Sequence, residues 1–306
     1  MQKDDTNTIK NIIISGGGIA GIAFYGALKH LATRDVWNVD NIEHIYATSI
    51  GTVIAVMIAL QYDWEELDDF ILIRPWHRVF KFDLTSILNA IENRGVFNNN
   101  IMKEIFKPLL LGKDMDIDIT MNEFYDKTGI HCHFICMDLN SMTHLSISHE
   151  THPEWKLIDA IYCSCALPIC FSPYIYQNSY LCDGGFIANY PVDICLQDNC
   201  DASKTLGIGF GQTEQKDHHD DEKNVNTDFN LFDYVLTLLM NLIRTVNVRK
   251  NNNSLCKEVL FDPTNPAFHN IYDTMNSKDT RRQLMDIGTE RAIDMCLLHS
   301  SIESID

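Results

Sequence analysis

The fold class follows from residues 12–21, which read IIISGGGIAG. The apolar run at 11–15 is typical of a buried strand, the three glycines end it, and 19–32 has the apolar spacing of a helix. A second unit follows directly, because 42–48 has the pattern of a strand and 50–60 is apolar on every face, as a buried helix is. Two short strand-turn-helix units in succession predict an α/β fold with a parallel sheet.

The glycine loop, Gly16-Gly17-Gly18 followed by Gly21, can be used in two ways. It satisfies the G-x-G-x-x-G pattern of dinucleotide-binding folds, which also need an acid at the end of the second strand to hold the ribose. The second strand ends instead at Thr48-Ser49, so this use is the weaker one. The other use is to aim backbone N–H groups at an anion, such as the oxyanion of an acyl-transfer reaction. A tight turn that binds nothing is the alternative to both.

A candidate nucleophile, Ser49, lies where the second strand passes into its helix. The sequence from Ala47 to Gly51 matches the G-x-S-x-G nucleophile elbow except at its first position, where alanine replaces glycine. Such a sharp turn brings the residues two before and two after the serine together, so both must be small, and we expect Ala47 to be tolerated. The alternative is a serine that only caps the following helix.

Asp183-Gly184-Gly185 follows a short predicted strand, 180–182, and offers a base for this serine. An aspartate at a strand end, with two glycines that let the chain turn away, can place its carboxylate directly against a hydroxyl. The pKa of a free aspartate is about 3.9, so partial desolvation would be needed to make it a stronger base. An ordinary Asp-Gly turn is the alternative.

A triad completed by a later histidine, His269 or His299, is a second arrangement for the base. The order serine, aspartate, histidine suits an α/β-hydrolase. In that fold several strands precede the nucleophile, whereas Ser49 ends only the second predicted strand and the glycine loop ends the first. Neighbouring strand-helix turns would place oxyanion donors beside the serine, so a Ser-Asp dyad is the simpler interpretation.

In these motifs the sequence resembles the patatin-like phospholipases. The matching blocks occur in order over about 12–195 and are Ser15 to Gly21 with Gly26-Ala27-Leu28, Ala47 to Gly51, Ser164 to Pro168 with Phe171-Ser172-Pro173, and Asp183 to Gly185 with Asn189-Tyr190-Pro191. The resemblance implies a three-layer α/β/α sandwich with a mainly parallel central sheet and a helical C-terminal extension. It also implies hydrolysis of acyl esters in lipids by a Ser-Asp dyad, through an acyl-enzyme and without a metal ion or cofactor.

Carried over by position, the resemblance makes Ser49 the nucleophile and Asp183 the base. The amides of Gly16, Gly17 and Gly18 would form the oxyanion hole. The residues that would support these groups are Gly21, Ala47, Gly51, Gly184 and Gly185. Two departures stand out, namely Ala47 and the Ile19-Ala20 pair where many members carry a basic residue, but neither removes a catalytic group. We therefore expect a serine acyl hydrolase, a phospholipase A or lipid esterase, and the alternative is a catalytically silent relative that only binds lipid.

Composition limits the partners and the location of the protein. The chain has 306 residues and a formal net charge of −18, which repels polyanions and argues against nucleic acid as a partner. Its 10 cysteines are too few for a disulfide scaffold, and residues 1–10 lack the apolar core of a signal peptide. The longest apolar runs, 50–60 and 231–243, are too short or too interrupted to span a bilayer. We expect a cytoplasmic protein that meets lipid at a membrane surface, and the sequence does not indicate its oligomeric state.

Two segments are candidates for that membrane contact. The stretch from Arg74 to Phe82 combines basic and aromatic side chains, which suits a membrane interface, although aromatic side chains packed inside the protein are the favoured alternative. The predicted helix 230–248 could be a lid or a membrane-facing helix, and here a core helix is favoured.

The cysteines and histidines outside these motifs are expected to be structural. Cys163, Cys165, Cys170 and Cys182 do not have the spacing of a zinc site. His131 and His133 alternate along a predicted strand, 131–138, and are expected to be satisfied structural residues, whereas His218-His219 is expected to be solvated.

We expect one domain over residues 1–306, because no linker separates two cores. In this interpretation 12–197 forms the phospholipase-like core and 198–306 adds strands and helices that complete the fold. Within the second part, 211–228 is rich in acidic residues and is expected to form a solvated loop.

Overall fold

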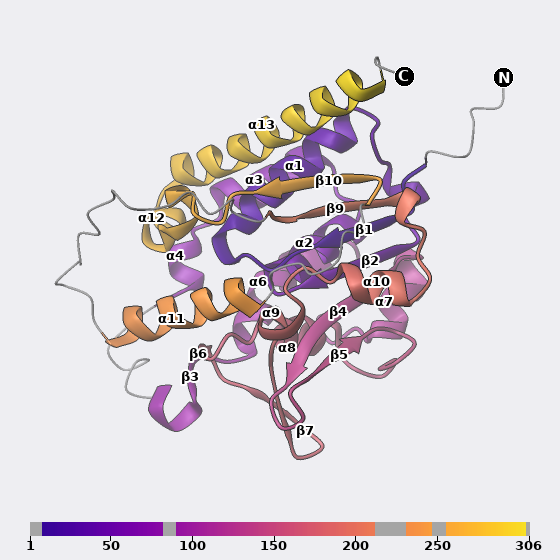
Figure 1. Ribbon diagram of the computed structural model, residues 1–306. Helices are drawn as coiled ribbons and strands as arrows, with labels where there is room; N and C mark the ends of the chain where they lie inside the picture. The colour runs from indigo at the N-terminus through magenta and orange to yellow at the C-terminus, as the bar shows by residue number, and fades with distance from the viewer. Residues whose placement is uncertain (1–7, 82–89, 212–230, 247–254, 304–306) are drawn as a thin grey trace.

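The computed structural model describes residues 8–81, 90–211, 231–246 and 255–303 (Figure 1). Its main sheet has the strand order β10-β9-β1-β2-β4-β8-β7, with β5 paired to β4. The strands are β1 (Asn11–Ile14), β2 (His44–Thr48), β4 (His131–Asp138), β5 (Thr143–Ile147), β7 (Tyr174–Tyr176), β8 (Ser179–Asp183), β9 (Thr205–Phe210) and β10 (Lys257–Phe261). From β10 to β4 neighbouring strands are parallel, whereas β5, β7 and β8 join antiparallel. The predicted mainly parallel α/β sheet is confirmed.

Helices cover both faces of this sheet, because its central strands are apolar on both sides. Successive side chains of a strand point to opposite faces, so Ile12 and Ile14 pack into one cluster and Ile13 into another. The larger cluster includes buried residues of α1 (Gly21–Thr33), α2 (Ile50–Ala59), α3 (Trp64–Ile73), α6 (Asn100–Leu111), α7 (Met121–Thr128), α8 (Leu157–Cys165) and α13 (Lys278–Glu303). The smaller cluster is covered by α10 (Val192–Gln197). The result is an α/β/α sandwich with one thick and one thin helical layer.

The C-terminal third of the chain shares this sheet. Strand β9 pairs with β1, β10 pairs with β9, and α13 lies along α1 (Figure 1). The two helices approach so closely that a Cβ atom on Gly288 would lie 1.9 Å from the carbonyl oxygen of Ala23. We propose on this basis that residues 1–306 form one domain, in which 198–306 completes the core of 12–197.

The remaining helices are α4 (Trp76–Val79), α9 (Gly185–Ala188), α11 (Leu231–Val246), α12 (Ile271–Asn276), and the 3-10 helices η2 (Gly18–Ala20), η3 (Val39–Asn41), η4 (Ala202–Lys204) and η5 (Pro266–His269). A separate parallel pair is formed by β3 (Gly95–Phe97) and β6 (Ile169–Phe171).

The sequence pattern missed the shortest strands. The strands β3, β6 and β7 were not among the expected elements. Each of these strands has only three residues, too few for an alternating pattern to be recognised. Phe82, His218-His219 and most of the predicted acidic loop lie outside the described residues.

Candidate active site

The candidate dyad lies where two strands meet end to end along one edge of β4. Strand β2 ends with Thr48 paired to Ile135, and β8 ends with Asp183 paired to the next residue, Cys136. Strand β5 pairs with residues 134–138 of β4 and so occupies the opposite edge, which leaves β2 and β8 on the same one. Because β2 is parallel and β8 antiparallel to β4, their C-terminal ends face each other. The turn that follows β2 and the turn that follows β8 therefore lie next to each other.

Ser49 and Asp183 are in direct contact at this junction. The Ser49 hydroxyl donates a hydrogen bond to Asp183 Oδ2 at 2.6 Å, and the Gly185 amide donates to Asp183 Oδ1 at 2.7 Å. The Asp183 side chain is only 3% exposed. Burial raises the pKa of Asp183 to about 6, and the hydrogen bonds from Ser49 and Gly185 oppose part of that rise. The carboxylate is thus held as a hydrogen-bond acceptor for the serine, with a basicity well above that of an exposed aspartate.

The backbone at Ser49 has the form of a nucleophile elbow. Its φ is +53°, in the left-handed region that a residue other than glycine rarely occupies, and its side chain makes no helix-capping hydrogen bond. The capping alternative is therefore contradicted. A Cβ atom on Gly51 would lie 2.5 Å from the carbonyl oxygen of Ile14, so only glycine fits there. Ala47 is fully buried, and its methyl group is accommodated within the larger core cluster.

A hydrogen-bond relay through Ser164 of α8 holds the elbow against β4. The Ser49 amide donates to Ser164 Oγ at 2.9 Å, and the Ser164 hydroxyl donates to the Ile135 carbonyl at 2.6 Å. Ser164 is fully buried, so both of its partners depend on it. Sequence reasoning missed this role, although Ser164 begins one of the motif blocks.

The glycine loop lies beside the serine, but its three amides are not equivalent. A Cβ atom on Gly16 would lie 3.2 Å from Ser49 Cβ, which shows how close the loop is. The Gly16 amide donates to the Asn189 carbonyl at 2.8 Å, so it is already engaged. Among the described residues, the amides of Gly17 and Gly18 have no acceptor, and Gly18 is exposed with a φ of +54°. Of the three amides expected to bind an oxyanion, those of Gly17 and Gly18 therefore remain available.

Asn189 connects the glycine loop to the turn that carries Asp183. Its side-chain Nδ2 donates to Ser15 Oγ and to the Gly16 carbonyl, both at 3.1 Å. Because Asn189 directly follows α9, it fixes the start of the glycine loop to the turn that carries Asp183. This is a second role that the motif blocks contained but sequence reasoning did not assign.

Helix α11 lies next to this site. It lies beside α9 (Figure 1), and a Cβ atom on Gly185 would lie 3.4 Å from Ile243 Cδ1. Ile243 is buried, whereas Tyr234, Leu238 and Leu242 are 58%, 46% and 44% exposed. Within the described part of the chain, the expectation of a core helix is therefore wrong for the face of α11 that carries these three side chains.

In the segment that begins at Arg74, the aromatic side chains of Trp76 and Phe80 are half-buried, whereas His77, Arg78 and Lys81 are exposed. The Arg74 guanidinium donates to the carbonyl oxygens of Glu104 and Ile105, at 2.6 and 3.1 Å, and the Trp76 indole donates to the Ile71 carbonyl at 2.7 Å. These contacts follow the packing alternative, and the segment's last residue, Phe82, lies outside the described residues.

No histidine of the described structure hydrogen bonds to Ser49 or Asp183. His269 ends η5, and the side chain of His299 lies outside the described part. The four cysteines of 163–182 are free and at least half-buried, and burial raises the pKa of each, so their thiols stay protonated. Within the described ranges, no helix has the length and apolar character needed to cross a bilayer.

Comparisons with known proteins agree with the motif blocks. A protein of Invertebrate iridescent virus 6 named "Probable lipid hydrolase 463L" is 25% identical over 191 residues, which are 61% of this chain and 63% of that protein. "Lysophospholipase NTE1" of Kluyveromyces lactis is 24% identical over 65% of this chain, which is 12% of its own length. The matched regions thus cover less than two thirds of both relatives.

The fold has a counterpart among solved structures. The crystal structure of VipD from Legionella pneumophila superimposes with a TM-score of 0.50 and 15% identity, over 91% of this chain and 67% of that one. The family model described as "Patatin-like phospholipase" matches residues 12–196, which contain both strands that meet at the junction and every motif block. The chain therefore belongs to the patatin-like phospholipase family.

Proposed function

We propose that the protein is a serine acyl hydrolase that cleaves acyl ester bonds of lipids with a Ser49-Asp183 dyad. The observation that carries the proposal is the 2.6 Å hydrogen bond from the Ser49 hydroxyl to a buried carboxylate, on a strained elbow. Membership of the family and the names of the two relatives support a lipid ester as the substrate class.

In the proposed acylation step, Ser49 Oγ attacks the ester carbonyl carbon while its proton moves to Asp183 Oδ2. The negative charge that develops on the carbonyl oxygen is stabilised by the amides of Gly17 and Gly18, which have no acceptor within the described protein. Each such donor contributes roughly 3 kcal/mol in comparable sites. The tetrahedral intermediate then expels the alcohol or lysolipid, which takes the proton from Asp183, and the acyl group remains on Ser49.

In the proposed deacylation step, Asp183 accepts a proton from a water molecule that attacks the acyl-enzyme. Collapse of the second tetrahedral intermediate releases the fatty acid, and the proton returns to Ser49. The carboxylate acts as a base only when it is ionised. With a pKa of about 6, most of the Asp183 carboxyl is ionised near pH 7, while its basicity is higher than that of an exposed aspartate.

We further propose that lipid approaches the site over α11. The exposed side chains of Tyr234, Leu238 and Leu242 recur every four residues and thus lie on one face of the helix. Ile243, on the opposite side, contacts the turn that carries Asp183. A lipid surface that covers the outer face of α11 would therefore lie next to the reacting groups.

A serine-directed fluorophosphonate probe, combined with ester hydrolysis, tests the dyad. We expect the wild-type protein to be labelled and to hydrolyse p-nitrophenyl esters and phospholipids, and we expect Ser49→Ala to lose both properties, with a rate loss of at least about 1,000-fold. Asp183→Asn keeps the shape of the side chain but removes the base, so it should lose hydrolysis to a similar extent.

The control is Ser172→Ala, because the buried Ser172 Oγ has no hydrogen-bond partner within the described protein and its removal should leave the rate unchanged. Absence of labelling and hydrolysis in folded wild-type protein would favour the silent lipid-binding alternative. Near-normal hydrolysis by Asp183→Asn would exclude the aspartate as the base.

A further inference from the structure

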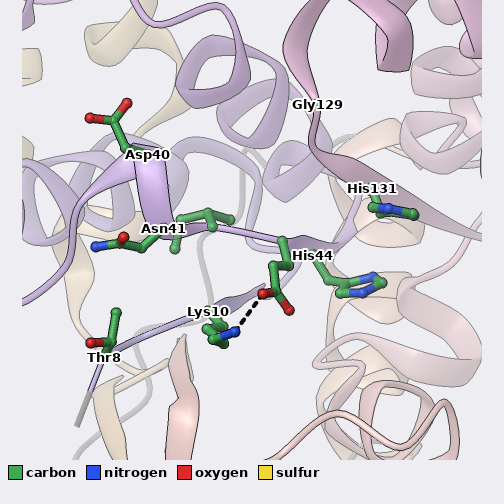
Figure 2. A pocket seen from close by; sticks show the side chains of 9 residues that line it. Thr8, Lys10, Asp40, Asn41, His44, Gly129 and His131 are labelled. Atoms are coloured by element: carbon green, nitrogen blue, oxygen red, sulfur yellow. Dashed lines mark hydrogen bonds and ion pairs between the residues drawn. The ribbon is translucent and has the colours of Figure 1, made fainter. Parts of the chain in front are cut away.

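A second polar cluster lies at the opposite end of the sheet from the dyad. Strands β2 and β4 begin there with His44 and His131, whose ring centroids are 4.6 Å apart. Figure 2 shows these two side chains at the edge of a pocket with a volume of about 530 Å³, which they line together with residues that precede β2. The proposed ester hydrolysis uses none of these groups.

The β4–β5 hairpin brings two more ligand-bearing residues to His131. Phe134 pairs with Ile147, so extension of the same antiparallel register past the end of β5 places His149 and Glu150 beside the start of β4. The contacts agree, since the ring centroids of His131 and His149 are 4.7 Å apart and His131 Nδ1 lies 3.7 Å from Glu150 Oε1. A nitrogen from each histidine and a carboxylate oxygen thus converge from the two strands of one hairpin.

The imidazole rings of His131 and His149 differ from those of His44 and His133 in their hydrogen bonds. The Nδ1 atoms of His131 and His149 are both buried, and neither has a hydrogen-bond partner among the described residues. By contrast, His44 Nδ1 and His133 Nε2 lie 3.2 Å apart and satisfy each other. Buried polar atoms without partners are rare and need an explanation, and a bound ion is one that suits imidazole nitrogen.

We propose that His131, His149 and Glu150 bind a divalent transition-metal ion of the zinc type. One ligand atom from each residue lies within 4.8 Å of the others. Metal–nitrogen bonds of about 2.0 Å in a tetrahedral site bring ligand atoms to roughly 3.3 Å from one another, so the site must contract on binding. The Glu150 side chain is 63% exposed and can rotate toward the two rings.

The surroundings fit such a site. Tyr125 stacks on His149 with ring centroids 3.8 Å apart and planes 9° apart, which holds the imidazole in place. Two histidines and a glutamate are a known zinc donor set that leaves a fourth position for water. The ion would link the first residue of β4 to the turn after β5, so its expected role is to stabilise the hairpin.

The test uses the full-length protein, freed of metal with a chelator and then titrated with Co²⁺ and Zn²⁺. We expect one equivalent to bind, with the visible absorption of tetrahedral Co²⁺ and a rise in the unfolding temperature. His149→Ala and Glu150→Gln should each weaken binding by about 10-fold or more. His152→Ala is the matched control from the next turn of the chain, because His152 Nδ1 already has a partner in Thr151 Oγ1 at 2.9 Å, and it should bind as the wild type does.

Three results would overturn the proposal. One is no saturable binding by the wild type, and the second is unchanged binding by Glu150→Gln and His149→Ala. Glu150→Gln changes an exposed side chain, so it keeps the test valid even if His149→Ala does not fold. The third is loss of binding in a His218→Ala, His219→Ala double variant, or an ultraviolet thiolate-to-cobalt band, since either would place the ion elsewhere.

Discussion

The two ends of β2 carry polar clusters that differ in how their atoms are satisfied. At the C-terminal end, Ser49, Ser164 and Asp183 form an unbroken set of hydrogen bonds, and within the described residues the amides of Gly17 and Gly18 have no acceptor. At the N-terminal end, the buried Nδ1 atoms of His131 and His149 have no hydrogen-bond partner among the described residues, although Glu150 Oε1 lies 3.7 Å from that of His131. The proposed role of the first cluster is to bind a transient oxyanion, and the proposed role of the second is to hold a metal ion.

Burial acts on both clusters but has different consequences. It raises the pKa of Asp183 to about 6, and together with the neighbouring histidines it lowers the pKa of His133 to about 3, so in both cases the neutral form is favoured. His133 is therefore neutral throughout the physiological range. Asp183 is ionised there, at a cost in stability, and its proposed role as a base rests on this raised pKa. The neutral ring of His133 carries no such cost.

The largest effect on stability is expected from Asp183→Asn, because this substitution removes the free-energy cost of keeping a buried carboxylate ionised. The pKa of Asp183 is about 6 in the folded protein, against a usual value of 3.8, so folding favours the protonated carboxyl. The free energy of unfolding should therefore fall as the pH rises from 3.8 to about 6, and it should stay low at higher pH. The difference corresponds to on the order of 3 kcal/mol. Asp183→Asn should therefore be more stable than the wild type by up to that amount at pH 8, and nearly equal to it at pH 4.

Urea unfolding at the two pH values measures this difference. Asp69→Asn, which changes an exposed carboxylate, is the control and should leave the pH dependence as in the wild type. If Asp183→Asn were equally or less stable than the wild type at pH 8, the carboxylate would not be under the burial cost on which its role as a base depends.

A smaller effect is expected from Ser164→Ala, which tests the hydrogen-bonded network at the same end of β2. The substitution removes the acceptor of the Ser49 amide and one donor to the Ile135 carbonyl, at a cost of about 1–3 kcal/mol in the free energy of unfolding. Because the elbow is strained at Ser49, kcat for a soluble ester should fall with little change in KM. Ser172→Ala removes a buried hydroxyl that has no hydrogen-bond partner in the described part of the chain, and it should change neither value. Equal effects of the two substitutions would show that Ser164 does not position the elbow.

How far the sequence could predict this site depends on what constrains each residue. Ser49, Gly51 and Asp183 could be identified because local backbone geometry permits few residue types there, and the close approach of the Ile14 carbonyl to Gly51 is one such constraint. The direction of β8 could not be predicted. It depends on long-range pairing with β4, and that antiparallel pairing brings Asp183 to the serine.

In the histidine cluster, too, local structure could be predicted and long-range placement could not. The strand at 131–138 could be predicted, yet His131 was assigned only a structural role. His149 and Glu150 reach it through the register of the hairpin, which is set by the turn between the strands and not by either strand alone. The role of Ser164 was missed for a related reason, because it depends on where α8 packs against β4.

The smallest effect is expected from substitutions in the surfaces that surround the two ends of β2. The C-terminal end of β2 lies near α11, whose outer face is apolar, whereas the pocket at the other end is lined mostly by polar residues. Leu238→Asp and Leu242→Asp should each lower hydrolysis of phosphatidylcholine vesicles by roughly 10-fold, the loss expected if one leucine no longer enters the lipid. Hydrolysis of a soluble short-chain ester should stay unchanged, because Ile243 and its contact with the turn after Asp183 are kept.

The control for this comparison is Leu298→Asp on α13, which changes a leucine that is 63% exposed away from the dyad. It should leave both rates unchanged. If it slowed vesicle hydrolysis as much as the α11 variants do, the loss would follow from a negative charge added anywhere on the surface of a protein of −18, and not from the position of α11. A loss confined to the α11 variants would instead assign the lipid-facing surface to the end of the sheet that holds Ser49 and Asp183.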